Sequence, residues 1–214
     1  MMNHYKSLLG VEKLKEKLRR ITGIILILIG PAIIAPIVYK KIETNKKQKE
    51  LQNILEEVIN EESKELTEEE EEKLINGYKP IALMEIPSIG LSQGIVEGIN
   101  DDVLQYYLGH FETSVGPGED GNFSVAGHRV SDYSEAFVNL YKAEIGDEII
   151  VKANKKKYIY KITESFIVSP DQVDVLEDTQ DPTITLVTCT VGAKERLIVK
   201  GKLVETKDLI TEGE

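Results

Sequence analysis

A run without a charged residue, positions 21–39, constrains this chain more than any other feature. A helix needs roughly 20 apolar residues to cross the hydrocarbon core of a membrane, so the run is just long enough. The alternative is a cleaved signal peptide, which usually has a shorter apolar core and a small-residue cleavage site. Ala32 and Ala35 offer only weak sites of that kind. We therefore predict a retained transmembrane anchor at residues 21–39.

Basic residues flank the predicted anchor on both sides. Residues 1–20 contain six Lys or Arg residues, and residues 40–49 contain five lysines. Loops with an excess of Lys and Arg stay on the cytoplasmic side of a membrane, but here the two counts are nearly equal. The charges alone therefore leave open on which side of the membrane the rest of the chain lies.

The residues that follow the anchor, 40–78, are polar and include five consecutive glutamates at 68–72. Such an acidic run binds calcium or a partner in some proteins, but most often it is a solvated spacer. This run lacks the alternating oxygen ligands and the turn glycine of a calcium loop. We interpret 40–78 as an acidic helical or flexible stalk, and 206–214 as a polar tail.

Charge and cysteine content argue against several classes of protein. The chain has 26 Lys and Arg against 37 Asp and Glu, a formal net charge of −11. Nucleic-acid binding needs clustered Lys and Arg, so we expect no nucleic-acid partner. A single cysteine cannot form an internal disulfide, and it argues against a structural zinc site. If the folded domain lies outside the cytoplasm, its free thiol is either buried or exposed for a purpose.

From residue 79 to 205 the sequence consists of short apolar or alternating runs separated by turn residues. This pattern predicts a mostly β domain, a largely antiparallel barrel or sandwich. We expect one short helix at 101–111, capped by Asn100 or Asp101, and a second at 134–140. The predicted strands are 81–86, 91–96, 123–126, 148–152, 158–163, 166–168, 184–189 and 196–204.

Cys189 is the candidate nucleophile. It ends an apolar run, 185–189, where a strand gives way to a loop and side chains become accessible. Catalysis by a cysteine needs a thiolate, a proton carrier and a group that stabilises the oxyanion. His128 is the stronger candidate for the proton carrier because it too follows a β run, 123–126. His110 lies in an aromatic-rich stretch that is more typical of packing.

Arg196 is the candidate oxyanion stabiliser. It opens the strand-like run 196–199, and alternation places it on the face of that strand that points away from the core. Its guanidinium keeps its charge and donates several hydrogen bonds, as a developing oxyanion requires. The alternative is a solvated surface arginine or an ion pair with Glu195.

Three motifs together resemble those of the sortases, the membrane-anchored cysteine transpeptidases of Gram-positive bacteria. They are Ala-Gly-His-Arg at 126–129, Thr-Leu-Val-Thr-Cys-Thr at 185–190 and Arg-Leu-Ile-Val at 196–199. Their order and spacing agree with the family, and the resemblance covers residues 79–205. It implies a catalytic domain that is a closed eight-stranded β-barrel with short helices. It also implies a single-pass protein of the cell membrane, with residues 1–20 in the cytoplasm and the barrel outside the cell.

The resemblance also implies a reaction and the residues that carry it. Cys189 would attack the Thr–Gly bond of a Leu-Pro-x-Thr-Gly-like sorting signal on a surface protein and hold the chain as a thioacyl intermediate. His128 would protonate the leaving amine and activate the incoming one, which a peptidoglycan precursor supplies. Arg196 would stabilise the oxyanion, and Thr188, beside the nucleophile, would line the substrate site. No cofactor is implied.

The subclass and the chemistry leave alternatives open. A single N-terminal anchor and Gly-His-Arg at 127–129 resemble class D, or a class A-like housekeeping sortase. Pilin-polymerising class C sortases usually carry an aromatic-acidic lid and a second hydrophobic span, and this sequence shows neither. Class A members use calcium, but the loop carboxylates Glu112, Asp120 and Glu177 have no spacing that assigns such a site. The rival hypotheses are a cysteine protease that uses water as acceptor, and a non-catalytic membrane-tethered β-domain with a buried thiol.

Overall fold

The computed structural model describes residues 2–60, 78–130 and 136–209. The chain forms two compact units, Met1–Ile42 and Glu43–Glu214. The first unit belongs to a long helix, α1 (Met2–Asn60). The second contains the end of that helix and a closed β-barrel.

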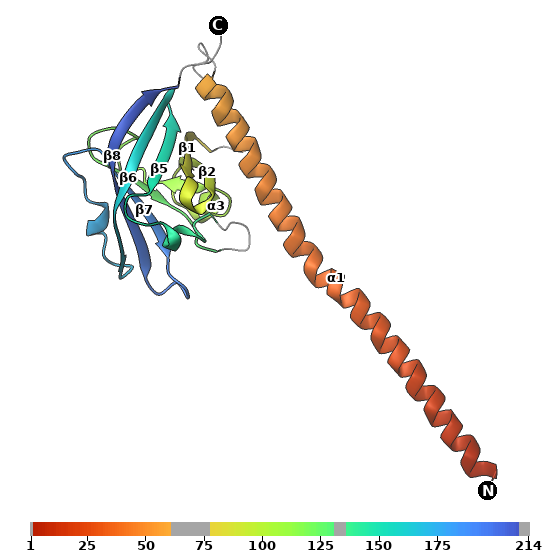
Figure 1. Ribbon diagram of the computed structural model, residues 1–214. Coiled ribbons are helices and arrows are strands. Elements are labelled where there is room, and N and C mark those ends of the chain that lie inside the picture. Colours follow the sequence, from red (N-terminus) through yellow and green to blue (C-terminus); the bar gives the residue numbers. More distant parts are fainter. Residues whose placement is uncertain (1, 61–77, 131–135, 210–214) are drawn as a thin grey trace. The chain divides into compact units, whose positions relative to one another are not determined.

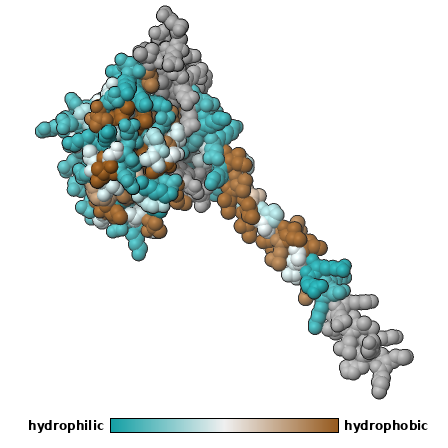
Figure 2. All heavy atoms as spheres, in the orientation of Figure 1, coloured by the Kyte–Doolittle hydropathy of each residue, from teal (hydrophilic) through white to brown (hydrophobic). Residues whose placement is uncertain are grey.

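Helix α1 carries the apolar run that we predicted as an anchor. Its segment Lys15–Leu51 is long and apolar enough to cross a membrane, and Figure 2 shows hydrophobic residues gathered along it. Large apolar side chains are exposed there, Ile27 at 71% and Leu28 at 67%. Exposed apolar surface of this kind agrees with a helix that packs against lipid. Pro31 and Pro36 lie inside the helix without ending it.

Eight strands make up the barrel, and they pair in a closed ring (Figure 1). They are β1 (Pro80–Ile86), β2 (Leu91–Glu97), β3 (Leu108–His110), β4 (Asn122–Ala126), β5 (Glu148–Ala153), β6 (Lys156–Val168), β7 (Thr183–Cys189) and β8 (Arg196–Asp208). Their order around the ring is β1-β2-β3-β4-β7-β8-β6-β5, and β5 pairs with β1. Neighbours are antiparallel except β2 with β3 and β4 with β7, which are parallel. The mostly β, closed eight-stranded barrel implied by the three motifs is therefore confirmed.

The interior of the barrel is filled by alternate side chains of the strands. Phe123 of β4, Tyr160 of β6 and Leu186 of β7 belong to one core cluster and are fully buried. Phe137, from the connection between β4 and β5, packs in the same cluster. Burial of apolar surface stabilises a fold by roughly 25 cal/mol per Å². Because this burial uses one face of each strand, the opposite face is available for other tasks.

The segment that we predicted as one helix, 101–111, contains two different elements. Only a short turn, α3 (Asp101–Leu104), is helical, and its N-cap Asn100 accepts a hydrogen bond from the Val103 N–H at 3.0 Å. The following residues Leu108–His110 form β3, which pairs with β2 and β4. The cap prediction is confirmed, but the prediction of a single helix was wrong because closure of the barrel requires this strand.

Two further predictions differ in detail from the structure. The runs 158–163 and 166–168 form the single strand β6, because an irregularity between Ile162 and Glu164 lets the chain keep its pairing with β8. The predicted helix at 134–140 lies partly outside the described residues. Its described end forms turns that lead into a 3-10 helix, η2 (Leu140–Lys142).

Two side chains near the end of α1 contact residues of the barrel within the second unit. Leu51 is fully buried in an apolar cluster with residues of β1, β2 and α3. The Gln48 side chain accepts a hydrogen bond from the Gly94 N–H at 3.4 Å and donates one to the Tyr106 carbonyl. The beginning of the predicted stalk is therefore helical, and residues 61–77 lie outside the described residues.

A hydrogen bond to Tyr160 connects the loop that precedes β4 with the interior of the barrel. The Tyr160 hydroxyl accepts a hydrogen bond from the Gly118 N–H at 2.7 Å. The ring is fully buried, and burial raises the pKa of the hydroxyl. The neutral hydroxyl thus holds the loop from which β4 begins.

We expect Tyr160→Phe to lower the free energy of unfolding by about 1–3 kcal/mol, because a partly buried N–H loses its acceptor. Urea unfolding followed by circular dichroism measures the change. Tyr141→Phe is the matched control, since Tyr141 is 54% exposed. Equal unfolding midpoints for the two variants would contradict the role of this hydrogen bond.

Candidate active site

The three predicted catalytic residues lie at or just beyond the ends of three neighbouring strands, β4, β7 and β8. In the parallel pair of β4 and β7, Ala126 lies opposite Val187. In the antiparallel pair of β7 and β8, Cys189 lies opposite Arg196. His128 follows Ala126 by two residues, just as Cys189 follows Val187, so the parallel register carries His128 to the end of β7 that holds Cys189. Strand pairing therefore brings the thiol, the imidazole and the guanidinium to the same end of the sheet.

Cys189 lies on the outer face of the barrel. The side chains of Ile184 and Leu186 fill the interior, and the alternation of β7 turns Cys189 to the opposite face. Its thiol is free and partly exposed. Leu197 and Val199 of β8 also point inward, so Arg196 shares the outer face with Cys189, as the alternation of the sequence predicted.

The Arg196 guanidinium is folded back toward the loop that joins β7 to β8. Its Nη1 donates to the carbonyls of Ala193 at 3.4 Å and Glu195 at 3.3 Å. The loop itself is closed by the Thr190 N–H, which donates to the Glu195 carbonyl at 3.0 Å. In the part of the chain that the structure describes, Arg196 forms no ion pair with Glu195. Both contacts use Nη1, which leaves the other guanidinium N–H groups for a ligand.

His128 is held in place by its neighbours. The Gly127 N–H donates to the Val187 carbonyl at 3.1 Å, so the pairing of β4 with β7 extends to the residue before His128. A Cβ at Gly127 would lie 2.6 Å from the Phe137 ring and 2.6 Å from the Leu108 side chain, so any larger residue at this position would force its neighbours to shift. The His128 carbonyl accepts a hydrogen bond from the Phe137 N–H at 3.0 Å. These contacts hold the backbone of the half-buried His128 beside the end of β7.

Thr188 lies on the inner side of β7 and is 3% exposed. Its hydroxyl donates to the Gly127 carbonyl at 2.8 Å. Thr188, which precedes Cys189, is thus hydrogen-bonded to Gly127, which precedes His128. A role for Thr188 in lining the substrate site stays a prediction.

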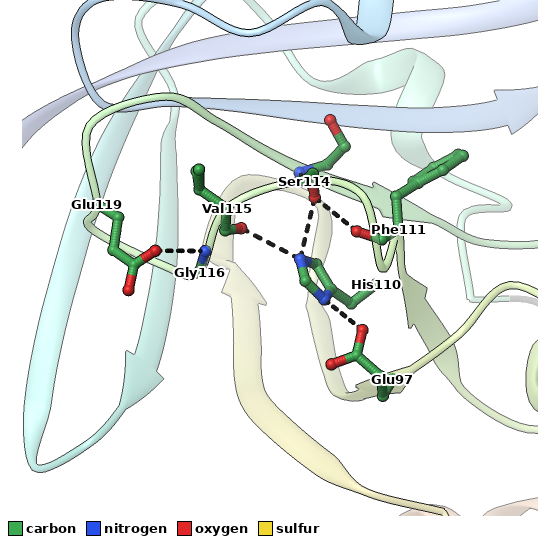
Figure 3. Close-up of polar contacts among 8 residues, drawn as sticks. Glu97, His110, Phe111, Ser114, Val115, Gly116 and Glu119 are labelled. Atoms are coloured by element: carbon green, nitrogen blue, oxygen red, sulfur yellow. Dashed lines mark hydrogen bonds and ion pairs between the residues drawn. The ribbon is translucent and has the colours of Figure 1, made fainter.

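His110, the other candidate proton carrier, is a buried residue with a structural network (Figure 3). Its Nδ1 lies 2.7 Å from Glu97 Oε1, and its Nε2 lies 3.1 Å from the Val115 carbonyl oxygen and 3.0 Å from Ser114 Oγ. Both ring nitrogens therefore have polar partners within hydrogen-bond distance. The ring is 6% exposed, and these bonds tie β3 to β2 and to the following loop.

An apolar cluster lies beside Cys189 and Arg196 on the outer face. Its members are Phe166, Val168, Val175, Leu176, Val187 and Ile198. Val187 precedes Cys189 by two residues and Ile198 follows Arg196 by two, so the cluster extends from the site itself. We call it the outer cluster. The sequence alone did not reveal it, because its members come from β6, β7, β8 and the 3-10 helix η3 (Asp174–Leu176).

The described residues contain no group of three His, Cys, Asp or Glu side chains that could hold a metal ion. Glu112, Asp120 and Glu177, considered above as calcium ligands, are each exposed. We therefore assign no metal ligands.

Taken together, the site offers the groups needed for acyl transfer through a thiol. In the predicted roles, Cys189 would supply a nucleophile, His128 a proton carrier and Arg196 a cationic hydrogen-bond donor for an oxyanion. The partly exposed members of the outer cluster, Phe166, Leu176 and Val187, add apolar side chains on the outer face. Such a set of groups is suited to a thiol-dependent acyltransferase or hydrolase.

Comparison with known proteins specifies the class. Residues 84–204 match the family model of the sortase domain. A solved sortase D5 transpeptidase of Clostridium perfringens has a TM-score of 0.63 and 39% identity, covering 75% of this chain and 99% of that one. Sortase A of Bacillus anthracis is 26% identical over 207 residues, which are 90% of this chain and 98% of the relative. Sortase D of Bacillus subtilis strain 168 is 30% identical over 128 residues, 57% of this chain and 63% of the relative.

The chain belongs to the sortase family, whose members are cysteine transpeptidases. The resemblance carried by the three motifs is thereby confirmed.

We expect His128→Ala to lower the turnover of a sorting-signal peptide by about 10²–10⁴-fold, because proton transfer to the leaving amine is lost. A fluorogenic peptide assay measures this. His110→Gln is the control, and it should lower the unfolding midpoint but keep the turnover of the unmutated chain at temperatures where it stays folded. The opposite pattern, with His110 essential and His128 dispensable, would exclude the assignment.

Proposed function

We propose that the protein cleaves a Leu-Pro-x-Thr-Gly-like sorting signal between Thr and Gly and joins the surface protein to an amine of a peptidoglycan precursor. One observation carries the proposal: strand pairing gathers Cys189, His128 and Arg196 at one end of the sheet. Membership of the sortase family supports transpeptidation as the reaction.

The first half-reaction forms a thioacyl intermediate. The Cys189 thiolate attacks the carbonyl carbon of the signal threonine, and the negative charge that develops on oxygen is stabilised by the Arg196 guanidinium. When the carbon–nitrogen bond breaks, protonated His128 gives its proton to the leaving glycine amine. The surface protein is then held on Cys189 as a thioester.

The second half-reaction transfers the acyl group. An incoming amine attacks the thioester carbonyl, His128 accepts a proton from that amine, and Cys189 leaves as a thiolate. A new amide bond replaces the thioester, and the Cys189–His128 pair returns to its starting charge state. Water in place of the amine would give hydrolysis by the same steps.

The outer cluster supports a peptide donor. An extended signal that reaches Cys189 along β7 would place its leucine and proline against Val187 and Leu176, which are partly exposed members of that cluster. Apolar contact there favours a Leu-Pro sequence over a charged one. The solved sortase E1 of Streptomyces coelicolor, similar at a TM-score of 0.57 and 32% identity, holds a tripeptide in its active site.

Two finer assignments belong to the same proposal. Similarity to the sortase D5 transpeptidase of Clostridium perfringens, together with Gly-His-Arg at 127–129, favours class D over a class A-like or pilin-polymerising enzyme. The apolar helix near the N-terminus supports a membrane anchor at 21–39. We propose that residues 1–20 lie in the cytoplasm and the barrel outside the cell, where sorting signals and wall precursors meet.

Cys189→Ala should abolish both peptide cleavage and thioacyl capture, because the variant has no nucleophile. The measurement is mass spectrometry of the full chain in detergent after incubation with a Leu-Pro-Gln-Thr-Gly peptide, with circular dichroism to verify the fold. The unmutated chain should gain the mass of the acyl fragment. A Cys189→Ala chain that still joins the peptide to an amine would disprove the mechanism.

The acceptor is tested by analysing products with and without an added amine. A transpeptidase gives an amide product in the presence of triglycine, and a protease gives only the carboxylic acid. A thiol reagent provides a separate check, since a non-catalytic domain with an inaccessible Cys189 would resist labelling. Hydrolysis alone, or an inert thiol, would remove transpeptidation from the proposal.

Arg196→Lys should lower turnover by about 10²–10³-fold with little change in stability. Lysine keeps the charge but loses the planar fork of N–H donors. The fluorogenic assay and a urea titration measure the two effects. Near-normal turnover in the variant would show that Arg196 serves only to hold the β7–β8 loop.

A further inference from the structure

Asn122, the first residue of β4, is a buried amide that holds the loop between β6 and β7. Its side chain is 2% exposed. Nδ2 donates to the carbonyls of Glu177 at 3.1 Å and Val175 at 3.4 Å, both in the loop 169–182. Oδ1 accepts a hydrogen bond from the hydroxyl of Thr185 in β7 at 2.8 Å. The donors and the acceptor of the amide are therefore all used.

A further hydrogen bond connects the loop 169–182 to the backbone of Asn122. The Asn122 N–H donates to Asp178 Oδ1 at 3.0 Å. That oxygen also accepts the Thr179 N–H at 3.0 Å. The loop is thus attached to the start of β4 through two carbonyls and one carboxylate.

The attached part of the loop forms one wall of the outer cluster. The Val175 carbonyl accepts from Asn122, and the Val175 side chain packs in the cluster with Val168 and Ile198. The backbone that Asn122 holds is therefore the backbone that places Val175. A shift of this bond would move the loop that packs over Ile198, two residues along β8 from Arg196.

The chemistry of the position is specific for an amide. Two carbonyl oxygens face Nδ2, and carbonyls only accept, so the side chain must present an NH₂ group to the loop. An aspartate of the same shape would keep the acceptor for Thr185 but would turn a second oxygen toward the two carbonyls. The substitution Asn122→Asp thus removes the attachment of the loop and spares the contact inside the sheet.

We infer that Asn122 is a positioning residue that fixes the loop 169–182, and through that loop the selectivity for the Leu-Pro part of the signal. The inference rests on the proposed function, because it takes the partly exposed side chains of the outer cluster, those of Leu176 and Val187, as the contact for the signal. Asn122 does not contact the reacting atoms. Its effect is on how well an apolar peptide fits beside the thiol.

The test compares Asn122→Asp with the unmutated full chain in detergent micelles. Two fluorogenic peptides are used, one with Leu-Pro-Gln-Thr-Gly and one with Leu-Ala-Gln-Thr-Gly. We expect the KM for the first peptide to rise about tenfold with little change in kcat, because binding of the donor and not the chemistry is weakened. The preference for proline over alanine should narrow by a similar factor.

A matched control makes the same chemical change elsewhere. Asn139→Asp adds the same charge at the start of η2, where the Asn139 side chain forms no capping bond, and it should leave KM and the proline preference as they are. Labelling of Cys189 by a thiol reagent verifies that the site is formed. If Asn122→Asp does not fold, Asp178→Ala removes the second attachment from the exposed side of the loop and should shift KM in the same direction.

Each outcome separates the hypotheses. A lower unfolding midpoint with unchanged KM and unchanged proline preference would mean that Asn122 is only structural, and it would overturn the inference. A fall in kcat at constant KM would also overturn it. If the unmutated chain forms no thioacyl adduct with either peptide, the proposed function fails, and this result is distinct from the other two.

Discussion

The site depends on one pairing, that of β4 with β7. These strands are far apart in the sequence but run side by side in parallel, Ala126 opposite Val187. Parallel neighbours cannot be joined by a tight turn, so the chain must leave the sheet and return. Here the intervening chain forms β5 and β6, which complete the ring through β1 and β8. The same strand pairing therefore contributes both to the closed barrel and to the site.

The alternation of β7 separates the residues that fill the barrel core from the residues of the candidate active site. The inward side chains of β7, Ile184 and Leu186, join the core. Of its outward side chains, Val187 belongs to the outer cluster and Cys189 is the proposed nucleophile. Thr188 connects the core side of the strand to the site, since its buried hydroxyl donates a hydrogen bond to the carbonyl of Gly127, the residue before His128. A thiol can remain exposed on this strand without loss of stability, because the stability comes from the other face.

Where the signal was local, the sequence predicted the strands and the positions of the candidate catalytic residues on them. The run ending at Cys189 has the alternation and the terminus of an accessible strand, and the pattern of β8 placed Arg196 outside the core. The prediction failed at 101–111, where a helix cap at Asn100 or Asp101 favoured one continuous helix. There the parallel pairing with β2 decides the structure, and a Cβ at Gly109 would lie 2.3 Å from the Gly98 carbonyl oxygen. No local pattern encodes such a long-range contact.

The same reasoning explains why Asn122 and the outer cluster were not found from the sequence. An asparagine after Gly121 has the appearance of an ordinary turn residue, and only the folded chain brings Val175 and Glu177 to it. Loops as long as 169–182 are usually functional when they carry little regular structure. This loop is held by its polar backbone, through the amide of Asn122 and the carboxylate of Asp178.

Attachment through the backbone has a consequence for binding. If the loop were held only by burial of its apolar side chains, Leu176 would not be available at the surface. Because carbonyls also make the attachment, Leu176 can stay partly exposed while Val175 packs against Val168 and Ile198. A buried polar network that is fully satisfied also favours a single arrangement, since any other leaves polar groups unpaired. The network thus allows a loop to be both rigid and apolar on the side that meets a ligand.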